Sequence, residues 1–494
     1  MISNNIGTLF TFGLYLLFML GIGIIFYRKT KNLSDYILGG RGLNSWVTAM
    51  SAQASDMSGW LLMGLPGYAY IAGLESFWIA IGLCIGTYLN WKFIAKRLRK
   101  YTEYAGNSLT IPDYFENRFK DNSKILRITS ALFILIFFLI YTSSGFVAGA
   151  KLFSTVFGIS YKNGLFIGAF VIISYTFLGG FMAVSWTDFF QGVIMFIAII
   201  IVPIAGINLL GGVKNIYFSI KKINPELLNM FTRVDGSFLS IISIVSLLAW
   251  GLGYFGQPHI LARFMAIRSP GKVKKARNIA MIWVVISLFS AVMIGVIGRA
   301  YLQITLNQAE AEIIFIVLVN SFIIPIAGGL LLAAILAAIM STADSQLLVT
   351  SSAITKDFYK VLFRKKASPR ELVWASRSAV IVVAIIAYII ALNPKSSILG
   401  LVAYAWAGFG AAFGPIVLIS LFWRRMTRKG AIGGILAGGI VVIIWKQLNG
   451  GIFNMYEIVP GFILSTAAII ILSLLDKKPS RDILKEFDSI NQTD

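Results

Sequence analysis

Hydrophobic and polar residues alternate along this chain in long blocks. Apolar runs of about 20 residues recur between short polar stretches, and a helix needs about that length to cross a hydrocarbon core about 30 Å thick. In a bilayer the backbone must satisfy its own hydrogen bonds, so such runs indicate membrane helices. The pattern predicts an all-α integral membrane protein with about 13 transmembrane helices, at 6–26, 42–71, 74–95, 125–155, 163–183, 189–210, 238–264, 276–301, 314–348, 371–392, 397–423, 431–449 and 456–475.

Domain organisation follows from the spacing of these segments. No polar stretch between them is long enough to form a separate soluble domain. We therefore expect one transmembrane domain over 1–475, with a core at about 42–423, followed by a polar cytoplasmic tail over 476–494. Chain ends of this kind are often poorly ordered, and the same is expected of this tail.

Composition and charge agree with this assignment. Only 13% of the residues are charged, while 57% are hydrophobic; soluble domains carry about 25% charged residues. A net charge of +22 would suggest nucleic-acid binding in a soluble protein. Here most Lys and Arg lie in alternate loops, after segments 1, 3, 7, 9, 11 and 13. Since basic loops stay in the cytoplasm, the N-terminus is predicted outside and the C-terminus inside, with no role in nucleic-acid binding.

Several functional classes are disfavoured by what the sequence lacks. A single cysteine, Cys84, and a single histidine, His259, cannot supply a disulfide framework or a metal cluster of Cys and His. The sequence also has no Gly-rich nucleotide-binding loop. We therefore expect neither an enzyme nor an ATP-driven pump, and no cofactor. The 19-residue tail leaves no room for a signalling domain, which disfavours a sensor.

Two segments are poorly suited to form plain membrane helices. The stretch 51–59 (SAQASDMSG) is small and polar, and the stretch 250–259 (WGLGYFGQPH) contains three glycines and a proline. They lie five segments apart. Paired discontinuous helices at matching positions of two halves are typical of transporters built from inverted repeats. The core is therefore predicted to be a five-plus-five inverted repeat, formed by segments 2–6 and 7–11.

Asp56 is the strongest single indication of a functional site. A carboxylate within the membrane is costly and usually functional. The alternative is a structural acid satisfied by nearby backbone and hydroxyl groups. Ser55 and Ser58 flank Asp56, and unwound backbone there would expose carbonyls to a cation and N–H groups to a carboxylate.

A second polar cluster lies in the ninth segment, at 337–345 (AAIMSTADS). Ser341 and Thr342 place two hydroxyls in an apolar helix, where they either bind a hard cation or hydrogen-bond to the preceding turn of the helix. Asp344 and Ser345 share one helical face with Ser341. That face either holds a second cation or leaves Asp344 at the cytoplasmic mouth.

Four aromatic residues are candidates for lining a solute pocket. They lie beside the two breaks or within a segment, whereas Trp and Tyr in membrane proteins usually anchor at the interface. His259 is interpreted as a packing residue at a helix end. The four candidates are Trp60, Tyr141, Trp250 and Tyr254.

At these segments the chain resembles the sodium/solute symporter family, and within it the bacterial sodium/proline symporters. The resemblance runs through nearly the whole chain. It is carried by residues 34–67 (SDYILGGRGLNSWVTAMSAQASDMSGWLLMGLPG), 183–188 (AVSWTD), 249–266 (AWGLGYFGQPHILARFMA), 335–348 (ILAAIMSTADSQLL) and 400–415 (GLVAYAWAGFGAAFGP).

The resemblance implies the roles of individual residues. Sodium would bind the carbonyls of Ala54, Met57 and Ala338 and the hydroxyls of Ser341 and Thr342. Asp56 and Arg41 would serve sodium coupling, Asp56 by organising the break or by direct ligation, and Arg41 by coupling or inward gating. A second sodium site would involve Asp188, Asp344 and Ser345. The solute site implied is Ser58, Gly59, Trp60, Tyr141, Trp250, Tyr254, Gln257 and Pro258.

The function implied is symport of L-proline with Na⁺ by alternating access, in a multi-pass protein of the bacterial plasma membrane. The sodium gradient and the membrane potential would drive it. The partners expected are L-proline, Na⁺ and the lipid bilayer, with no obligate protein partner. A sugar, pantothenate or sialic acid remains an alternative cargo, although such solutes need more hydrogen-bonding groups. A passive channel also remains an alternative, distinguished by the absence of concentrative uptake.

Overall fold

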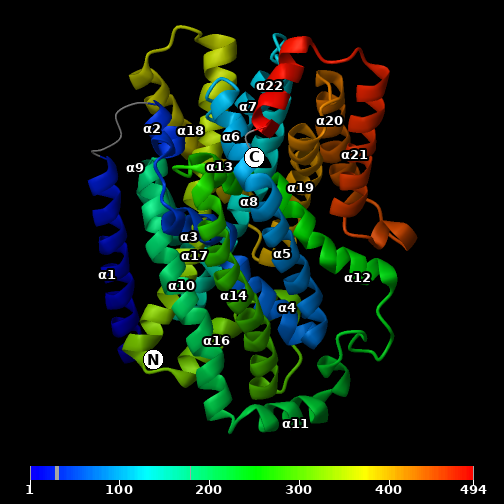
Figure 1. The fold of residues 1–494 in the computed structure, drawn as a ribbon. Coiled ribbons are helices and arrows are strands. Elements are labelled where there is room, and N and C mark those ends of the chain that lie inside the picture. The colour runs from blue at the N-terminus through cyan, green and yellow to red at the C-terminus, as the bar shows by residue number, and fades with distance from the viewer. Residues whose placement is uncertain (1, 28–32, 179, 493–494) are drawn as a thin grey trace.

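The structure is a computed structural model that describes every residue except 1, 28–32, 179 and 493–494. The described residues form a bundle of helices, with no regular β-sheet among them (Figure 1). The expected all-α class is confirmed. The long helices are α1 (Ile2–Tyr27), α8 (Ile125–Phe157), α9 (Tyr161–Leu178), α10 (Phe181–Leu209), α14 (Val273–Leu302), α17 (Pro325–Ser352), α18 (Pro369–Ile390), α19 (Ile398–Phe422), α20 (Arg428–Trp445) and α21 (Ile458–Leu475).

The number of spanning helices differs from the sequence-based count. Among the described residues, ten helices are long and apolar enough to cross a membrane, or eleven if one bent pair counts as a single span. The predicted count of 13 is not confirmed. One cause is that segment 2 is divided into shorter helices by a break. Another is that segment 5 contributes only a short apolar helix, Tyr161–Ser174.

The first break separates α3 (Ser45–Asp56) from a π-helical turn at Trp60–Gly64, which continues into α4 (Leu65–Ala72). Asn44 caps the start of α3 by accepting hydrogen bonds from the N–H groups of Trp46 and Val47. The helix ends at Met57, whose ψ of 72° is not helical. The small and polar residues at this point offer little to continue a membrane helix, as the sequence indicates.

The second break lies between α12 (Ile241–Leu248) and α13 (Pro258–Ala266), which enclose a 3₁₀ segment, Ala249–Gly256, here called η6. The part before the break, Ile241–Gly256, and the part after it, Pro258–Ala266, are bent by 45° relative to each other. Pro258 occupies the first turn of α13, where its missing N–H costs no hydrogen bond. The predicted pair of discontinuous helices is therefore present.

Glycines bring η6 into backbone contact with α5 (Phe77–Leu89). A Cβ at Gly86 would lie 2.2 Å from the carbonyl oxygen of Gly251, and a Cβ at Gly82 would lie 2.3 Å from that of Leu248. No larger residue fits at these positions without displacing the backbone. Through a π-helical turn at Asn90–Ile94, α5 continues into α6 (Ala95–Tyr104). One continuous helical segment therefore passes alongside the second break.

The two chain ends lie at opposite ends of the bundle (Figure 1). The N-terminal end of α1 lies near α16 (Ile314–Phe322), at the same end of the bundle as α11 (Val213–Ile223), while α22 (Arg481–Gln492) lies at the other end with α6 and α7 (Ile111–Phe119). The tail is not the poorly ordered segment that was expected. It forms α22, an amphipathic helix that buries Phe487 and Ile490.

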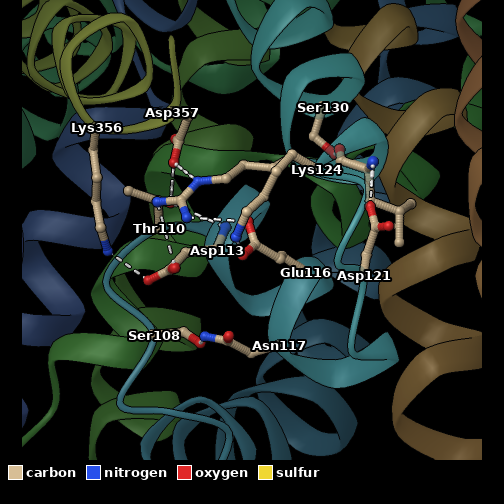
Figure 2. A network of polar contacts seen from close by, with 12 residues as sticks. Ser108, Thr110, Asp113, Glu116, Asn117, Asp121, Lys124, Ser130, Lys356 and Asp357 are labelled. Carbon is tan, nitrogen blue, oxygen red and sulfur yellow. Dashed lines mark hydrogen bonds and ion pairs between the residues drawn. The ribbon is translucent and has the colours of Figure 1, made fainter. Parts of the chain in front are cut away.

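A network of ion pairs ties α7 and α8 to the π-helical extension of α17 at Ala353–Phe363 (Figure 2). Arg127 is its centre: its guanidinium lies 2.7 Å from Asp357, 3.1 Å from Glu116 and 3.5 Å from Asp113. Lys356 lies 2.5 Å from Asp113. Burial alone would raise the pKa of Asp113, but the charges of Lys356 and Arg127 outweigh burial and hold that pKa below its usual value. The carboxylate therefore stays ionised and the network stays paired.

Replacing Arg127 by methionine should destabilise the protein by about 3–5 kcal/mol, because it leaves the fully buried Asp357 without its cation. The measurement is the apparent melting temperature of the purified protein in detergent. Arg127→Lys keeps the charge and should lower the melting temperature less. Arg364→Met removes an exposed ion pair with Glu371 and is the matched control, worth at most about 1 kcal/mol. Equal shifts for Arg127→Met and Arg364→Met would contradict the role of the network.

Candidate functional site

The break after α3 is the point where the candidate residues converge. It is packed against α17 and α19 and hydrogen-bonded to α8 and η6, and the residues around it are buried. Where the backbone leaves the helical conformation, some of its carbonyl and N–H groups have no hydrogen-bond partner within a helix. These groups make the break a natural binding position for a ligand.

Four of the five predicted sodium ligands meet directly. The Ser341 hydroxyl donates to the carbonyl of Ala54 at 2.7 Å and lies 3.2 Å from that of Ala338. The Thr342 hydroxyl lies 3.4 Å from the same Ala54 carbonyl. These contacts join α17 to the end of α3, so the hydroxyls do not bond only within their own helix. The site thus gathers carbonyl and hydroxyl oxygens, the ligands that hard cations take.

The fifth predicted ligand, Met57, lies at the end of α3. Ala338 lies one turn before Ser341 on α17, and Met57 is the first residue beyond α3. The Met57 N–H bonds to the carbonyl of Gln53, and its side chain is fully buried. All five predicted ligands therefore belong to the end of α3 and to the middle of α17, which contacts it.

Asp56 joins the break to the aromatic residues around it. Its Oδ2 accepts a hydrogen bond from the Tyr254 hydroxyl at 2.6 Å. Its backbone carbonyl accepts from the Trp60 indole at 3.1 Å and from the Tyr141 hydroxyl at 3.2 Å. Its Oδ1 is buried and has no partner among the described residues. Asp56 thus hydrogen-bonds to three of the four predicted aromatic residues.

The fourth aromatic residue, Trp250, packs against Trp60 with ring centroids 6.2 Å apart. Trp406 of α19, which sequence reasoning did not single out, supports both sides of this cluster. Its indole donates to the carbonyl of Trp250 at 2.7 Å, and its ring meets that of Tyr254 edge-on at 5.1 Å. Asn90, also not foreseen, donates to the carbonyl of Tyr254 at 2.9 Å.

The remaining predicted solute residues lie in the two breaks. Ser58 and Gly59 follow Met57, and a Cβ at Gly59 would lie 2.8 Å from that of Ala148 in α8. Gln257 donates to the carbonyls of Gly253 and Trp406, and its buried Oε1 has no partner in the described part of the chain. Pro258 begins α13.

Asp188, Asp344 and Ser345 are brought together, but around a residue that the sequence analysis missed. Arg263 of α13 lies 3.0 Å from Asp188 and 2.5 Å from the Ser345 hydroxyl. Ser51 donates to Asp188 at 2.6 Å. All these side chains are fully buried. A guanidinium therefore already lies among the groups expected to hold a second sodium ion.

Arg41 lies away from the break, at the end of the bundle that carries α6 and α7. It follows α2 (Leu33–Leu38) and bonds to four groups: the Met265 carbonyl at 2.7 Å, the Ser108 carbonyl at 2.9 Å, and the side chains of Asn107 and Thr102 at 3.0 and 3.1 Å. Arg41 therefore ties the segment before α3 to the α6–α7 connection and to the end of α13.

Glu312 makes a similar set of contacts toward the opposite end and was not foreseen. It accepts from Lys151 of α8 at 2.6 Å, from the Ser397 hydroxyl at 2.8 Å, and from the N–H groups of Ile398 and Leu399 at 3.1 Å. These N–H groups begin α19. The carboxylate thus joins the residues before α16 to two helices of the core.

Comparison with known proteins places this geometry in a family. Residues 36–438 match the Sodium:solute symporter family. The sodium/proline symporter of Escherichia coli is 52% identical over 485 residues, covering 97% of this chain and 95% of that protein. In Bacillus subtilis, the high-affinity proline transporter PutP is 50% identical over 477 residues, covering 96% and 99% of the two chains. The osmoregulated proline transporter OpuE of the same organism is 49% identical over 481 residues, covering 97% and 96%.

Solved structures share the fold. A Na⁺-coupled sialic acid symporter in a substrate-bound outward-open state superposes with a TM-score of 0.79 at 20% identity, covering 96% of this chain and 99% of that one. MhsT in complex with L-phenylalanine gives a TM-score of 0.52 at 14% identity, covering 87% and 97%. At such identities the structures establish a common architecture alone.

Proposed function

Because the chain belongs to the sodium:solute symporter family, we propose that it carries L-proline into the cell together with Na⁺. Proline transporters of three bacterial species are about 50% identical to this chain over nearly its full length. Transport of this kind needs no enzyme chemistry. The protein is a multi-pass membrane protein, and the bilayer of a bacterial plasma membrane is its proposed location.

The observation that carries the proposal is that one short segment contacts both groups of candidate ligand-binding residues. The Ala54 carbonyl contacts the hydroxyls of α17, and two residues later Asp56 contacts the aromatic residues of α8 and η6. A cation bound by the first group and a solute bound by the second would both hold the same break in place. Binding of either would then favour the conformation that binds the other, which is the requirement for coupled transport.

The proposed sodium site consists of the carbonyls of Ala54, Met57 and Ala338 and the hydroxyls of Ser341 and Thr342. The hydroxyls, which donate to carbonyls in this structure, would turn their lone pairs toward the ion. A site of five neutral oxygens, at the end of α3 and the middle of α17, would bind a monovalent ion without burying additional charged ligands.

The proposed solute site lies between the two breaks. The carboxylate of proline would take the N–H group of Gly59 and the hydroxyl of Ser58, since the Ser58 N–H is already bonded to the carbonyl of Asp56. Its apolar ring would lie against Trp60, Tyr141, Trp250 and Tyr254. The amine would face Asp56 and the unpartnered oxygen of Gln257. Larger solutes such as sialic acid need more hydrogen-bonding groups than these walls provide, which disfavours the nearest alternative cargo.

Alternating access would open and close the two ends of the bundle. Arg41 is proposed to close the end predicted to face the cytoplasm, and Glu312 the end predicted to face outward. Sodium and proline would enter from outside and leave inside, with the N-terminus outside and the C-terminus in the cytoplasm. The membrane potential would supply about 2.3 kcal/mol per charge per 100 mV.

A second sodium site at Asp188, Asp344 and Ser345 remains a proposal. Two carboxylates face one guanidinium, which leaves one negative charge when both are ionised. Asp188 Oδ1 and Asp344 Oδ2 are buried and have no partner in the described residues. A second cation would neutralise this charge and use these oxygens.

The proposed function predicts sodium-dependent uptake of radiolabelled L-proline into proteoliposomes. With an inward sodium gradient, proline should accumulate above its external concentration; unlabelled proline should compete, whereas sialic acid and pantothenate should not. Equal uptake with and without the gradient would contradict symport. Sodium-driven uptake of another solute would contradict only the assignment of the cargo.

Asp56→Asn should reduce sodium-stimulated proline uptake at least tenfold, because a hydrogen bond to a buried charged group contributes about 1.5–3 kcal/mol. Initial uptake rates at saturating and at limiting sodium are the measurement. Asp235→Asn, on an exposed turn far from the break, is the control and should behave like the wild type. If Asp56→Asn retained wild-type sodium dependence, Asp56 would be a structural residue only.

The two cation sites predict different sodium titrations. Ser341→Ala removes a proposed ligand and should raise the sodium concentration for half-maximal uptake about tenfold or more. Asp344→Asn should leave the first site intact and lower the Hill coefficient for sodium from above one to one. A wild-type Hill coefficient of one would remove the case for a second sodium ion. An unchanged titration in Ser341→Ala would remove Ser341 from the first site.

A further inference from the structure

Two hollows adjoin each other on the outer surface of the bundle, beside the first half of α3. Both include Trp46 at the start of α3 and Phe189 of α10. One is apolar and the other carries two lysines. Neither is used by the proposed transport function.

The apolar hollow, of about 240 Å³, lies between α3, α10 and α14. Its lining contains no charged side chain. Its floor is fixed, because the Trp283 indole donates to the carbonyl of Gly192 at 3.1 Å and stacks on Phe196 with ring centroids 6.1 Å apart. At its rim Trp46, Val193 and Ile282 are exposed by 54%, 37% and 63%. In a membrane helix, exposed apolar residues face lipid tails, so this groove is continuous with the lipid-facing surface.

The polar hollow, of about 530 Å³, adjoins the groove at the beginning of α14. Lys272 and Lys275 line it, and its lining contains no acidic residue. Both lysines are exposed. The backbone there is held in place, because the Ser45 hydroxyl donates to the carbonyl of Lys272 at 3.1 Å. Because this lining holds two cations and no carboxylate, the hollow favours binding of an anion.

The position of the lysines matches the depth of lipid headgroups. They lie at the start of the candidate span Pro270–Leu302, within a basic loop that the charge pattern predicts to face the cytoplasm. Polar ends of spanning helices lie at the headgroup level, and basic pockets between membrane helices on the cytoplasmic side are suited to anionic headgroups.

We propose that these two hollows form a binding site for one anionic phospholipid of the inner leaflet. Lys272 and Lys275 bind the headgroup phosphate, and one acyl chain lies along Trp46, Phe189 and Trp283. A free phosphate would leave the apolar groove unused, and a neutral lipid would leave the two lysines unused. The lipid would contact α3, the helix that ends at the proposed sodium site.

The test measures lipid binding to the purified full-length protein by native mass spectrometry, during titration with phosphatidylglycerol or phosphatidylcholine. Lys272→Gln combined with Lys275→Gln should weaken binding of the first phosphatidylglycerol roughly thirtyfold, the scale of two lysine–headgroup attractions. Binding of phosphatidylcholine should not change. Lys274→Gln is the matched control, since Lys274 is an exposed neighbour on the same helix that does not line either hollow.

Further arms separate a lipid site from a simple anion site. Val193→Trp should fill the groove and weaken the binding of long-chain phosphatidylglycerol, while the binding of a soluble short-chain analogue should not change. Equal loss in Lys274→Gln, or less than twofold loss in the double variant, would overturn the proposal. Displacement of long-chain phosphatidylglycerol by millimolar inorganic phosphate, or unchanged long-chain binding in Val193→Trp, would also overturn it, because the site would then bind a headgroup alone.

Discussion

Inside a membrane an unpaired backbone group has no water to bind, so a chain that spans a bilayer can leave its helical pattern only where something else satisfies those groups. In this protein the end of α3 is such a place. The hydroxyls of Ser341 and Thr342 reach across from α17 to the carbonyl of Ala54, and the aromatic residues of η6 and α8 reach the carboxylate and carbonyl of Asp56. The break is therefore held from two sides by different chemistry. That separation allows two unlike ligands to act on one segment.

Buried charge is arranged around this centre in paired groups. Arg263 lies among Asp188, Ser51 and Ser345, and Arg127 lies among three carboxylates at one end of the bundle. A buried ion pair adds little to stability, but breaking one is costly. Such groups therefore fix which helices stay together. Arg127 keeps α7 with α8 and α17. Arg41 instead bonds to residues in the connection between α6 and α7.

Much of this arrangement is readable in the sequence, because membrane burial makes polar residues conspicuous. Asp56, Ser341 and Thr342 stand out in apolar segments, and glycines with Pro258 mark the second break. Arg263 was missed since it directly precedes a basic loop and resembles one more loop cation. Trp406 was missed because a tryptophan in an apolar helix is ordinary, and its contacts depend on η6 folding beside it. The count of 13 helices is not confirmed, because hydropathy alone does not distinguish a broken or short segment from a full span.

The glycine contact between α5 and η6 has a mechanical consequence. With Gly82 and Gly86 against Gly251 and Leu248, no side chain lies between the two backbones to change rotamer, so the pair cannot slide without separating. A shift of Trp250 and Tyr254 is then delivered to α5 and, through its continuous extension, to α6. There Thr102 bonds to Arg41. A displacement of η6 in the middle of the membrane would therefore be carried along α5 and α6 to the contacts of Arg41 at the end of the bundle.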